Sequence, residues 1–255
     1  MFRERYEYFK RKNESVLVVG LDSDIHRINA NLFDFNKHII DETKDNVCGF
    51  KINIAFYEEA GEEGFKELKR TIDYIKKLEM PIILDVKRGD IANTAKAYAR
   101  AYFKRLKVDS ITVMPYMGSD SMKPYLELEN SHLFVVALSS NPGAEEFEIP
   151  ESLYLKVVSR VNELNRKYKN RVGVVVGATQ TEYVRKVRET GNDLLWLVPG
   201  IGSQGGNLKK FFESSSGYDN VLINSSRKII FSENPRLESQ KLKDEINLYR
   251  RKYEN

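Results

Sequence analysis

Two charged residues end an apolar run near position 85. Asp85 and Lys87 follow Pro81–Leu84, and because strand side chains alternate, both point to the same face. Two charges are costly to bury at a strand end without a purpose. The pair therefore indicates a functional site.

Two polar residues follow at helical spacing. Asp90 stands where a helix N-cap belongs, and Thr94 lies one helical turn further on. Taken alone, an Asp at this position is more often only a cap, so this residue has both a structural and a functional interpretation.

The first and second apolar runs also end in charged or polar residues. Asp22 ends the first run, whereas Lys51 and Asn53 end the second with a cation and an amide on one face. A lone Lys–Asp pair would more often be structural, but four charges that alternate in sign favour a site. The four are Lys51, Asp85, Lys87 and Asp90.

Later loops carry polar groups that could bind a small ligand. Ser139 and Ser140 precede an Asn-Pro-Gly turn and could bind the edge of a flat heterocycle, although an ordinary turn explains them equally well. Residues 199–206 are rich in glycine, which exposes backbone N–H groups, and Arg227 offers a bidentate guanidinium. Together these two loops predict a phosphate site.

The elements that position these residues alternate along the chain. Eight short runs, continuous in hydrophobicity and rich in β-branched residues, are typical of strands covered on both faces. The runs are Ser15–Asp22, Val47–Ile52, Pro81–Lys87, Ser110–Met114, His132–Leu138, Arg171–Ala178, Leu194–Val198 and Asn220–Asn224. Segments between them, such as residues 55–79 and 90–107, have a helical period.

Eight strand–helix units predict an α/β fold, a closed (β/α)8 TIM barrel. We expect a single domain over residues 1–255, with a short extra helix over Phe2–Lys12 beneath the barrel. Active sites of such barrels lie at the carboxyl ends of the strands. The charged strand ends should therefore converge.

Composition excludes several classes of protein. The single cysteine, Cys48, excludes a disulfide framework and a Cys-based zinc site, and predicts a cytoplasmic location. The three histidines lack the spacing of metal ligands. No signal peptide is expected, because the first fourteen residues are charged throughout. The longest run of apolar residues and glycine, Val172–Ala178, is too short to cross a membrane. Lys and Arg number 41 against 37 Asp and Glu without a block of like charge, so we expect neither nucleic-acid nor membrane binding.

One segment carries a specific resemblance. Residues 84–94 read LDVKRGDIANT, which resembles the D-x-K-x-x-D-I-x-x-T signature of the orotidine 5′-monophosphate decarboxylases. The D-x-K-x-x-D core is shared with the wider suprafamily, including 3-keto-L-gulonate 6-phosphate decarboxylase and hexulose-phosphate synthase. The distal Ile-x-x-Thr favours the orotidylate branch, in its second, bacterial-type subfamily, and the resemblance extends from Asp22 to Arg227 in the same strand order.

The resemblance implies decarboxylation of orotidine 5′-monophosphate (OMP) to uridine 5′-monophosphate (UMP), the last step of de novo UMP synthesis, without a metal or cofactor. Lys87 would stabilise the carbanion at C6 and protonate it. Asp85 would lie against the substrate carboxylate. Lys51 would hold Asp85 and touch the ribose, and Asp22 would bind a ribose hydroxyl.

Further contacts are implied by the same resemblance. Ser140, or Ser139, would read the pyrimidine, while Gln204 and Arg227 would bind the phosphate. Ser226 stands where many members have Gly, which predicts a less close approach of the backbone there. The other implied substrate contacts are Asn53, Ile91, Pro199 and Gly205.

The resemblance also implies a homodimer. In the family, the second Asp and the Thr of the signature reach across the subunit interface. Asp90 and Thr94 would then complete the site of the neighbouring subunit.

Three alternatives stay open. A metal-dependent sugar-phosphate lyase of the same suprafamily would need an acidic residue at the second strand end to help Asp85 hold Mg²⁺, but Lys51 occupies that region. A non-catalytic nucleotide-binding barrel would have no use for Lys87. Nucleic-acid binding through the basic surface is the third.

Overall fold

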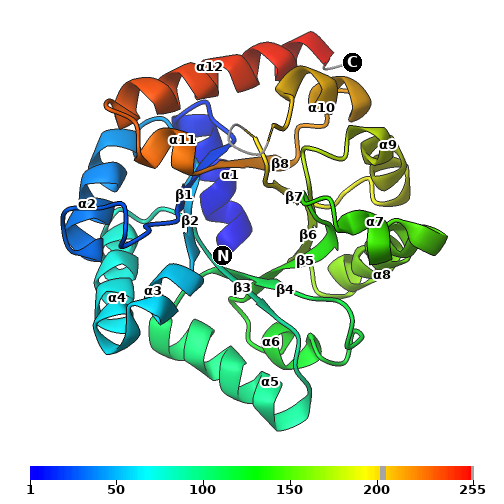
Figure 1. Cartoon of the computed structure of the whole chain (residues 1–255). Coiled ribbons are helices and arrows are strands. Elements are labelled where there is room, and N and C mark those ends of the chain that lie inside the picture. Colours follow the sequence, from blue (N-terminus) through cyan, green and yellow to red (C-terminus); the bar gives the residue numbers. More distant parts are fainter. Residues whose placement is uncertain (202–204, 254–255) are drawn as a thin grey trace.

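Eight parallel strands close into one barrel, in which β1 pairs with both β2 and β8 (Figure 1). The computed structural model describes residues 1–201 and 205–253. The strands are β1 (Leu17–Leu21), β2 (Gly49–Asn53), β3 (Ile82–Arg88), β4 (Ser110–Val113), β5 (His132–Leu138), β6 (Val172–Val176), β7 (Trp196–Val198) and β8 (Val221–Ser225). Each coincides with one predicted run, and β2, β3 and β8 extend one residue further. The predicted (β/α)8 barrel is confirmed.

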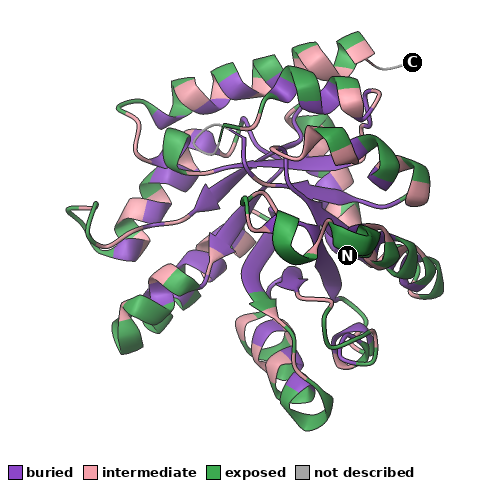
Figure 2. Cartoon of the chain, turned by 45° about the vertical axis from the view of Figure 1, so that its right-hand side comes forward, coloured by how far each residue is buried: buried purple, intermediate pink, exposed green. Residues whose placement is uncertain are grey.

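Helices surround the barrel, with their outward faces exposed and the strands buried (Figure 2). The longer ones are α1 (Phe2–Lys12), α2 (Leu32–Thr43), α4 (Gly61–Lys77), α5 (Ala92–Ala99), α8 (Leu153–Lys167), α9 (Thr181–Thr190) and α12 (Pro235–Tyr253). The shorter ones are α3 (Ala55–Glu59), α6 (Lys123–Leu126), α7 (Ala144–Phe147), α10 (Leu208–Ser214) and α11 (Arg227–Ile230), with a π-helix, η1, at Arg100–Leu106 and a 3-10 turn, η2, at Pro150–Ser152. Every residue of β1 and β5 is buried, because side chains fill the barrel inside and helices cover it outside.

The first helix closes the amino-terminal end of the barrel, as predicted. The ring of Phe2 lies 4.6 Å from that of His132, the first residue of β5. The Tyr6 hydroxyl donates to the carbonyl of Val221, the first residue of β8, at 3.0 Å. The opposite end is thus left for a site.

Two predicted helical segments are divided. Residues 55–79 form α3 and α4, which separate where Gly61 adopts a φ of 62°. Residues 90–107 form α5 followed by the π-helix η1. The prediction that Asp90 caps this helix is wrong. Ile91 is the N-cap residue, and the Asp90 carboxylate instead accepts a hydrogen bond from the Ile91 N–H at 2.8 Å.

Within residues 1–201 and 205–253, no helix is both long and apolar enough to span a membrane.

Candidate active site

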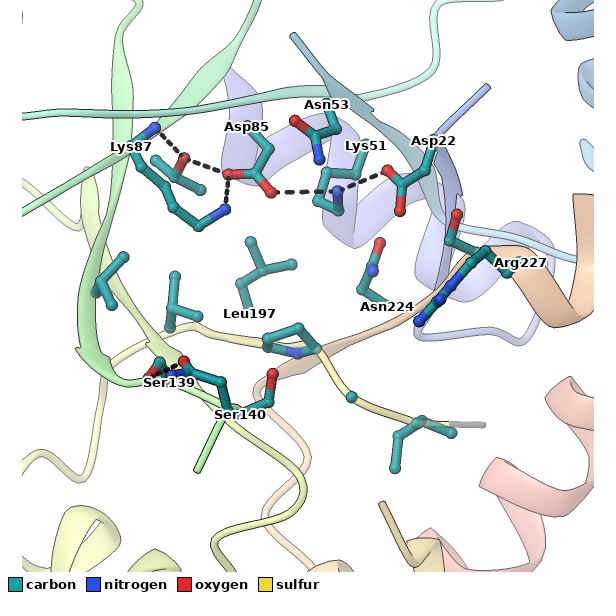
Figure 3. A pocket seen from close by; sticks show the side chains of 18 residues that line it. Asp22, Lys51, Asn53, Asp85, Lys87, Ser139, Ser140, Leu197, Asn224 and Arg227 are labelled. Atoms are coloured by element: carbon teal, nitrogen blue, oxygen red, sulfur yellow. Dashed lines mark hydrogen bonds and ion pairs between the residues drawn. The ribbon is translucent and has the colours of Figure 1, made fainter. Parts of the chain in front are cut away.

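A cavity of about 300 Å³ lies at the carboxyl ends of the strands (Figure 3). Side chains from β2, β3, β4, β5, β6, β7 and β8 line it, together with residues directly after β1, β5, β7 and β8. The predicted site residues that line it are Asp22, Lys51, Asn53, Asp85, Lys87, Ser140, Pro199, Ser226 and Arg227. The register of the barrel therefore brings together most of the residues chosen from the sequence.

Four of these residues form a chain of alternating charge along one wall (Figure 3). Lys51 Nζ lies 3.3 Å from Asp22 Oδ1 and 3.3 Å from Asp85 Oδ2. Lys87 Nζ donates to Asp85 Oδ1 at 2.7 Å. Asp85 thus has one cation on each oxygen, and the predicted common face of Asp85 and Lys87 is observed.

The pKa values of the two buried members follow from these contacts. Burial opposes ionisation of Asp85, but the charges of Lys51 and Lys87 outweigh it and hold the pKa of that carboxyl well below its ordinary range. Burial also disfavours the charged form of Lys51, yet Asp22 and Asp85 raise its pKa above the ordinary value. Both groups are therefore ionised at neutral pH.

Lys87 differs from Lys51 in its accessibility. Its side chain is 55% exposed, whereas that of Lys51 is 5% exposed. A molecule in the cavity can therefore reach the Lys87 ammonium, while Lys51 mainly fixes the two carboxylates beside it.

The wall near β5 is apolar with a polar edge. Val136, Val175 and Leu197 line the cavity there. Ser140 also lines it, and the Ser139 hydroxyl donates to Asn141 Oδ1 at 2.7 Å. A flat heterocycle suits such a surface, because its faces can pack on apolar side chains while its edge meets hydroxyl groups.

The phosphate-binding prediction concerns the region after β7 and β8. Arg227 begins α11 and lines the cavity together with Pro199. Gly205 does not line the cavity, and Gln204 lies outside the described residues.

Ser226, at the position where the resemblance implies a glycine, packs directly against Gly20 of β1. A Cβ at Gly20 would lie 2.9 Å from the Ser226 Cβ, so only glycine at position 20 leaves room for the serine. The Ser226 hydroxyl donates to the Gly20 carbonyl at 2.8 Å. The φ of Ser226 is −128°, which any residue can adopt.

Three predicted residues lie away from the cavity of their own chain. Asp90, Ile91 and Thr94 are not among the residues that line it. Thr94 is exposed, and Ile91 is 47% exposed despite its apolar side chain.

Metal ligands are sparse in the part of the chain that the structure describes. No three His, Cys, Asp or Glu side chains there are grouped so that they could hold a metal ion. Asp85 Oδ2 instead lies 3.3 Å from the Lys51 ammonium, a cation that would repel a divalent metal ion there.

Comparison with known proteins agrees with this geometry. The sequence profile of the orotidine 5′-phosphate decarboxylase / HUMPS family matches residues 15–242. The chain belongs to this family.

Relatives of the decarboxylase family cover nearly the whole chain. The orotidine 5′-phosphate decarboxylase of Dehalococcoides mccartyi is 38% identical, with 99% of each chain covered. That of Christiangramia forsetii is 43% identical, with 87% of this chain and 86% of the relative covered. Among solved structures, Leishmania donovani OMP decarboxylase superposes with a TM-score of 0.88 at 34% identity, covering 98% of each chain.

Two polar residues of this decarboxylase-family cavity were missed by the sequence reasoning. Thr112 lines it from the middle of β4, and Asn224 lines it from β8. Asn224 Oδ1 is buried and has no hydrogen-bond partner among the residues described. A polar residue inside an apolar run, such as Thr112, or at its carboxyl end, such as Asn224, is the signal that could have found them.

Proposed function

We propose that this chain decarboxylates orotidine 5′-monophosphate to uridine 5′-monophosphate, the last step of UMP synthesis, as a carboxy-lyase. The observation that carries the proposal is the Asp22–Lys51–Asp85–Lys87 chain of charges in the cavity. Membership of the decarboxylase family supports it, as do the names of the bacterial relatives.

The reaction requires a cation at one carbon atom. When the bond between C6 and the carboxylate breaks, CO₂ leaves and the electron pair stays on C6, where no adjacent carbonyl delocalises it well. The Lys87 ammonium would face C6 and stabilise this pair, then donate its proton to C6. A unit charge at 4 Å contributes about 4 kcal/mol at an effective dielectric constant near 20, so other effects must add to it. No metal or organic cofactor enters this mechanism.

Asp85 would lie against the substrate carboxylate. Its depressed pKa keeps it ionised, so two like charges would be in contact until CO₂ departs. Lys51 and Thr112 hold the Asp85 carboxylate in place, which prevents it from turning away from the substrate. Lys51 and Asp22 would also contact the ribose.

The remaining groups would orient the nucleotide. Ser140 would read the pyrimidine edge, Arg227 and Gln204 would bind the phosphate, and Asn53, Pro199, Gly205 and Ser226 would complete the contacts. Asn224 Oδ1 would accept a hydrogen bond from a substrate hydroxyl, since no described residue donates to it. Phosphate binding energy would be used to position the distant pyrimidine.

A homodimer would give roles to the residues outside the cavity. Asp90, Ile91 and Thr94 would reach the site of the neighbouring subunit. The exposure of Ile91 supports this arrangement, because an apolar side chain at a subunit interface is removed from water. We also propose a single-domain enzyme of the cytoplasm, where the lone Cys48 would stay reduced.

Loss of OMP absorbance on incubation with the purified chain, with and without excess EDTA, tests the proposed function. We expect turnover that EDTA does not change. Absence of turnover would contradict the proposal and favour a non-catalytic nucleotide-binding barrel. Turnover of a sugar phosphate that EDTA abolishes would favour a metal-dependent lyase instead.

A further inference from the structure

The strand that carries Asp85 and Lys87 is irregular where these residues stand. In the pairing of β3 with β4, Leu84 faces Ile111 and Arg88 faces Val113. Four steps along β3 thus correspond to two along β4, and Asp85, Val86 and Lys87 are opposite Thr112 alone. A bulge of this kind re-aims side chains but leaves backbone groups without ladder partners.

The Thr112 hydroxyl replaces those partners. Its Oγ1 accepts hydrogen bonds from the Val86 N–H at 3.0 Å and the Lys87 N–H at 2.9 Å, and it donates to Asp85 Oδ1 at 2.7 Å. One donor and two lone pairs are all that a hydroxyl has, so its full capacity is used. Thr112 is 2% exposed, and water has little access to substitute for it.

The bulge also holds a strained backbone. Lys87 has a φ of 44°, in the left-handed region that a residue with a Cβ seldom adopts. Thr112 binds the backbone at Val86 and Lys87, and from the other side the Arg88 guanidinium donates to the Val86 carbonyl at 2.9 Å. This conformation aims the Lys87 side chain back at Asp85 Oδ1, the same oxygen that Thr112 binds.

We propose that Thr112 is a positioning residue for the reaction, which sets the backbone and the carboxylate that aim the Lys87 ammonium. The inference rests on the proposed function, in which Lys87 acts at C6. Thr112 itself transfers no proton to the substrate. Because only geometry at Lys87 and Asp85 depends on it, its loss should lower kcat and spare the binding of UMP.

Three variants separate the effect of the Thr112 hydroxyl from the effect of the volume of the side chain. Thr112→Val has nearly the same shape without the hydroxyl, and Thr112→Ser and Thr112→Ala differ by one oxygen atom. We expect kcat for OMP to fall about 100-fold in the Val and Ala variants, as displacements near 1 Å in active sites do. The Ser variant should stay within about fivefold of the unaltered chain, and all variants should bind UMP within about threefold of it.

The control is Thr43→Val, which removes a buried hydroxyl that donates to the Ile39 carbonyl at 2.7 Å in α2, outside the cavity. It should lower stability without changing kcat. Equal kcat in Thr112→Val and the unaltered chain, or parallel losses in the Ser and Ala variants, would overturn the inference. If Thr112→Val does not fold, the Ser and Ala pair decides alone.

A crystal structure of the Val or Ala variant tests the geometry without any activity. The inference predicts that Lys87 Nζ leaves Asp85 Oδ1, and an unchanged separation of 2.7 Å would contradict it. An unaltered chain that does not consume OMP would refute the proposed function, whereas the crystal structure would still decide the role of Thr112.

Discussion

Replacing Lys51 by methionine removes a buried cation that lies between two carboxylates while keeping most of its volume. Lys51 Nζ is 3.3 Å from both Asp22 Oδ1 and Asp85 Oδ2. At this distance each contact is worth about 5 kcal/mol at an effective dielectric constant near 20. Desolvation of the buried ammonium offsets several kcal/mol of the total.

The net loss of folding stability depends on the two carboxylates that lose Lys51 as a partner. Removing one partner of a buried ion pair typically destabilises a protein by about 3–5 kcal/mol. Asp22 retains 20% exposure and can regain water, so we expect the lower end, about 3 kcal/mol at pH 7. Asp85, which is 10% exposed, would keep only Lys87 as a cation.

The loss should depend on pH in a defined direction. In the unaltered chain the pKa of Asp85 is below its unfolded value, so its stabilising contribution is present above about pH 4 and is lost as the pH falls through the native pKa. Without Lys51, the native pKa of Asp85 should rise, because only Lys87 and the Thr112 hydroxyl then oppose the effect of burial. The variant should then gain stability relative to the unaltered chain as the pH falls through that raised pKa, by about 1.4 kcal/mol per unit of the rise.

Urea unfolding at fixed protein concentration measures the difference in stability between Lys51→Met and the unaltered chain. The fluorescence of the single tryptophan, Trp196, which is fully buried beside Tyr218, reports the unfolding. Lys69→Met is the matched control, since its partner Asp73 is a half-exposed neighbour on α4 and such pairs contribute about 0.5 kcal/mol. A loss below about 1 kcal/mol for Lys51→Met at pH 7, or a loss that does not change with pH, would refute this reasoning.

Three further predictions concern the substrate. Arg227→Ala should raise KM for OMP at least about 100-fold, because it removes charge-assisted hydrogen bonds to the phosphate. The urea midpoint should stay unchanged, and a KM within threefold of that of the unaltered chain would contradict the prediction. Asn224→Leu should weaken UMP binding about fivefold in calorimetry, the value of one hydrogen bond, without loss of stability, since Asn224 Oδ1 has no described partner to lose; unaltered affinity would contradict it. Inactive Asp90→Asn and Lys87→Met chains, refolded together, should recover about a quarter of full activity if each site uses both subunits of a two-fold dimer. About half of the dimers would then be mixed, and each mixed dimer would hold one intact site of two. No recovery would exclude the shared site.

The strand pattern and the charged strand ends could be predicted because both depend on local rules. A run such as His132–Leu138, buried at every position, is recognisable from its continuous hydrophobicity. Alternation of side chains over two residues predicts that Asp85 and Lys87 share a face. The two do meet, but the bulge in β3 and the left-handed backbone at Lys87 set how they meet. In the closed barrel, β1 lies next to β2 and β2 next to β3, so the ends of these strands bring Asp22 and Lys51 beside Asp85 and Lys87.

What the sequence did not reveal depends on contacts between elements. The bulge in β3 appears only when β3 is paired with β4, so nothing in either segment alone marks Thr112 as a partner of Asp85. The compensation between Gly20 and Ser226 likewise joins residues far apart in the chain. The start of α5 at Ala92 instead of directly after Asp90 shows that a residue suited to capping does not fix a helix boundary.

Turnover by Lys87→Met measures the proposed mechanism most directly. Under single-turnover conditions with OMP, the proposal predicts a rate at least about 1,000-fold below that of the unaltered chain, because both the cation at C6 and the proton donor are lost. UMP should bind within about threefold of its affinity for the unaltered chain, since Lys87 lies away from the Arg227 end of the cavity in Figure 3. A Lys87→Met rate within tenfold of the unaltered rate would contradict the assignment of Lys87 as the group that carries the decarboxylation.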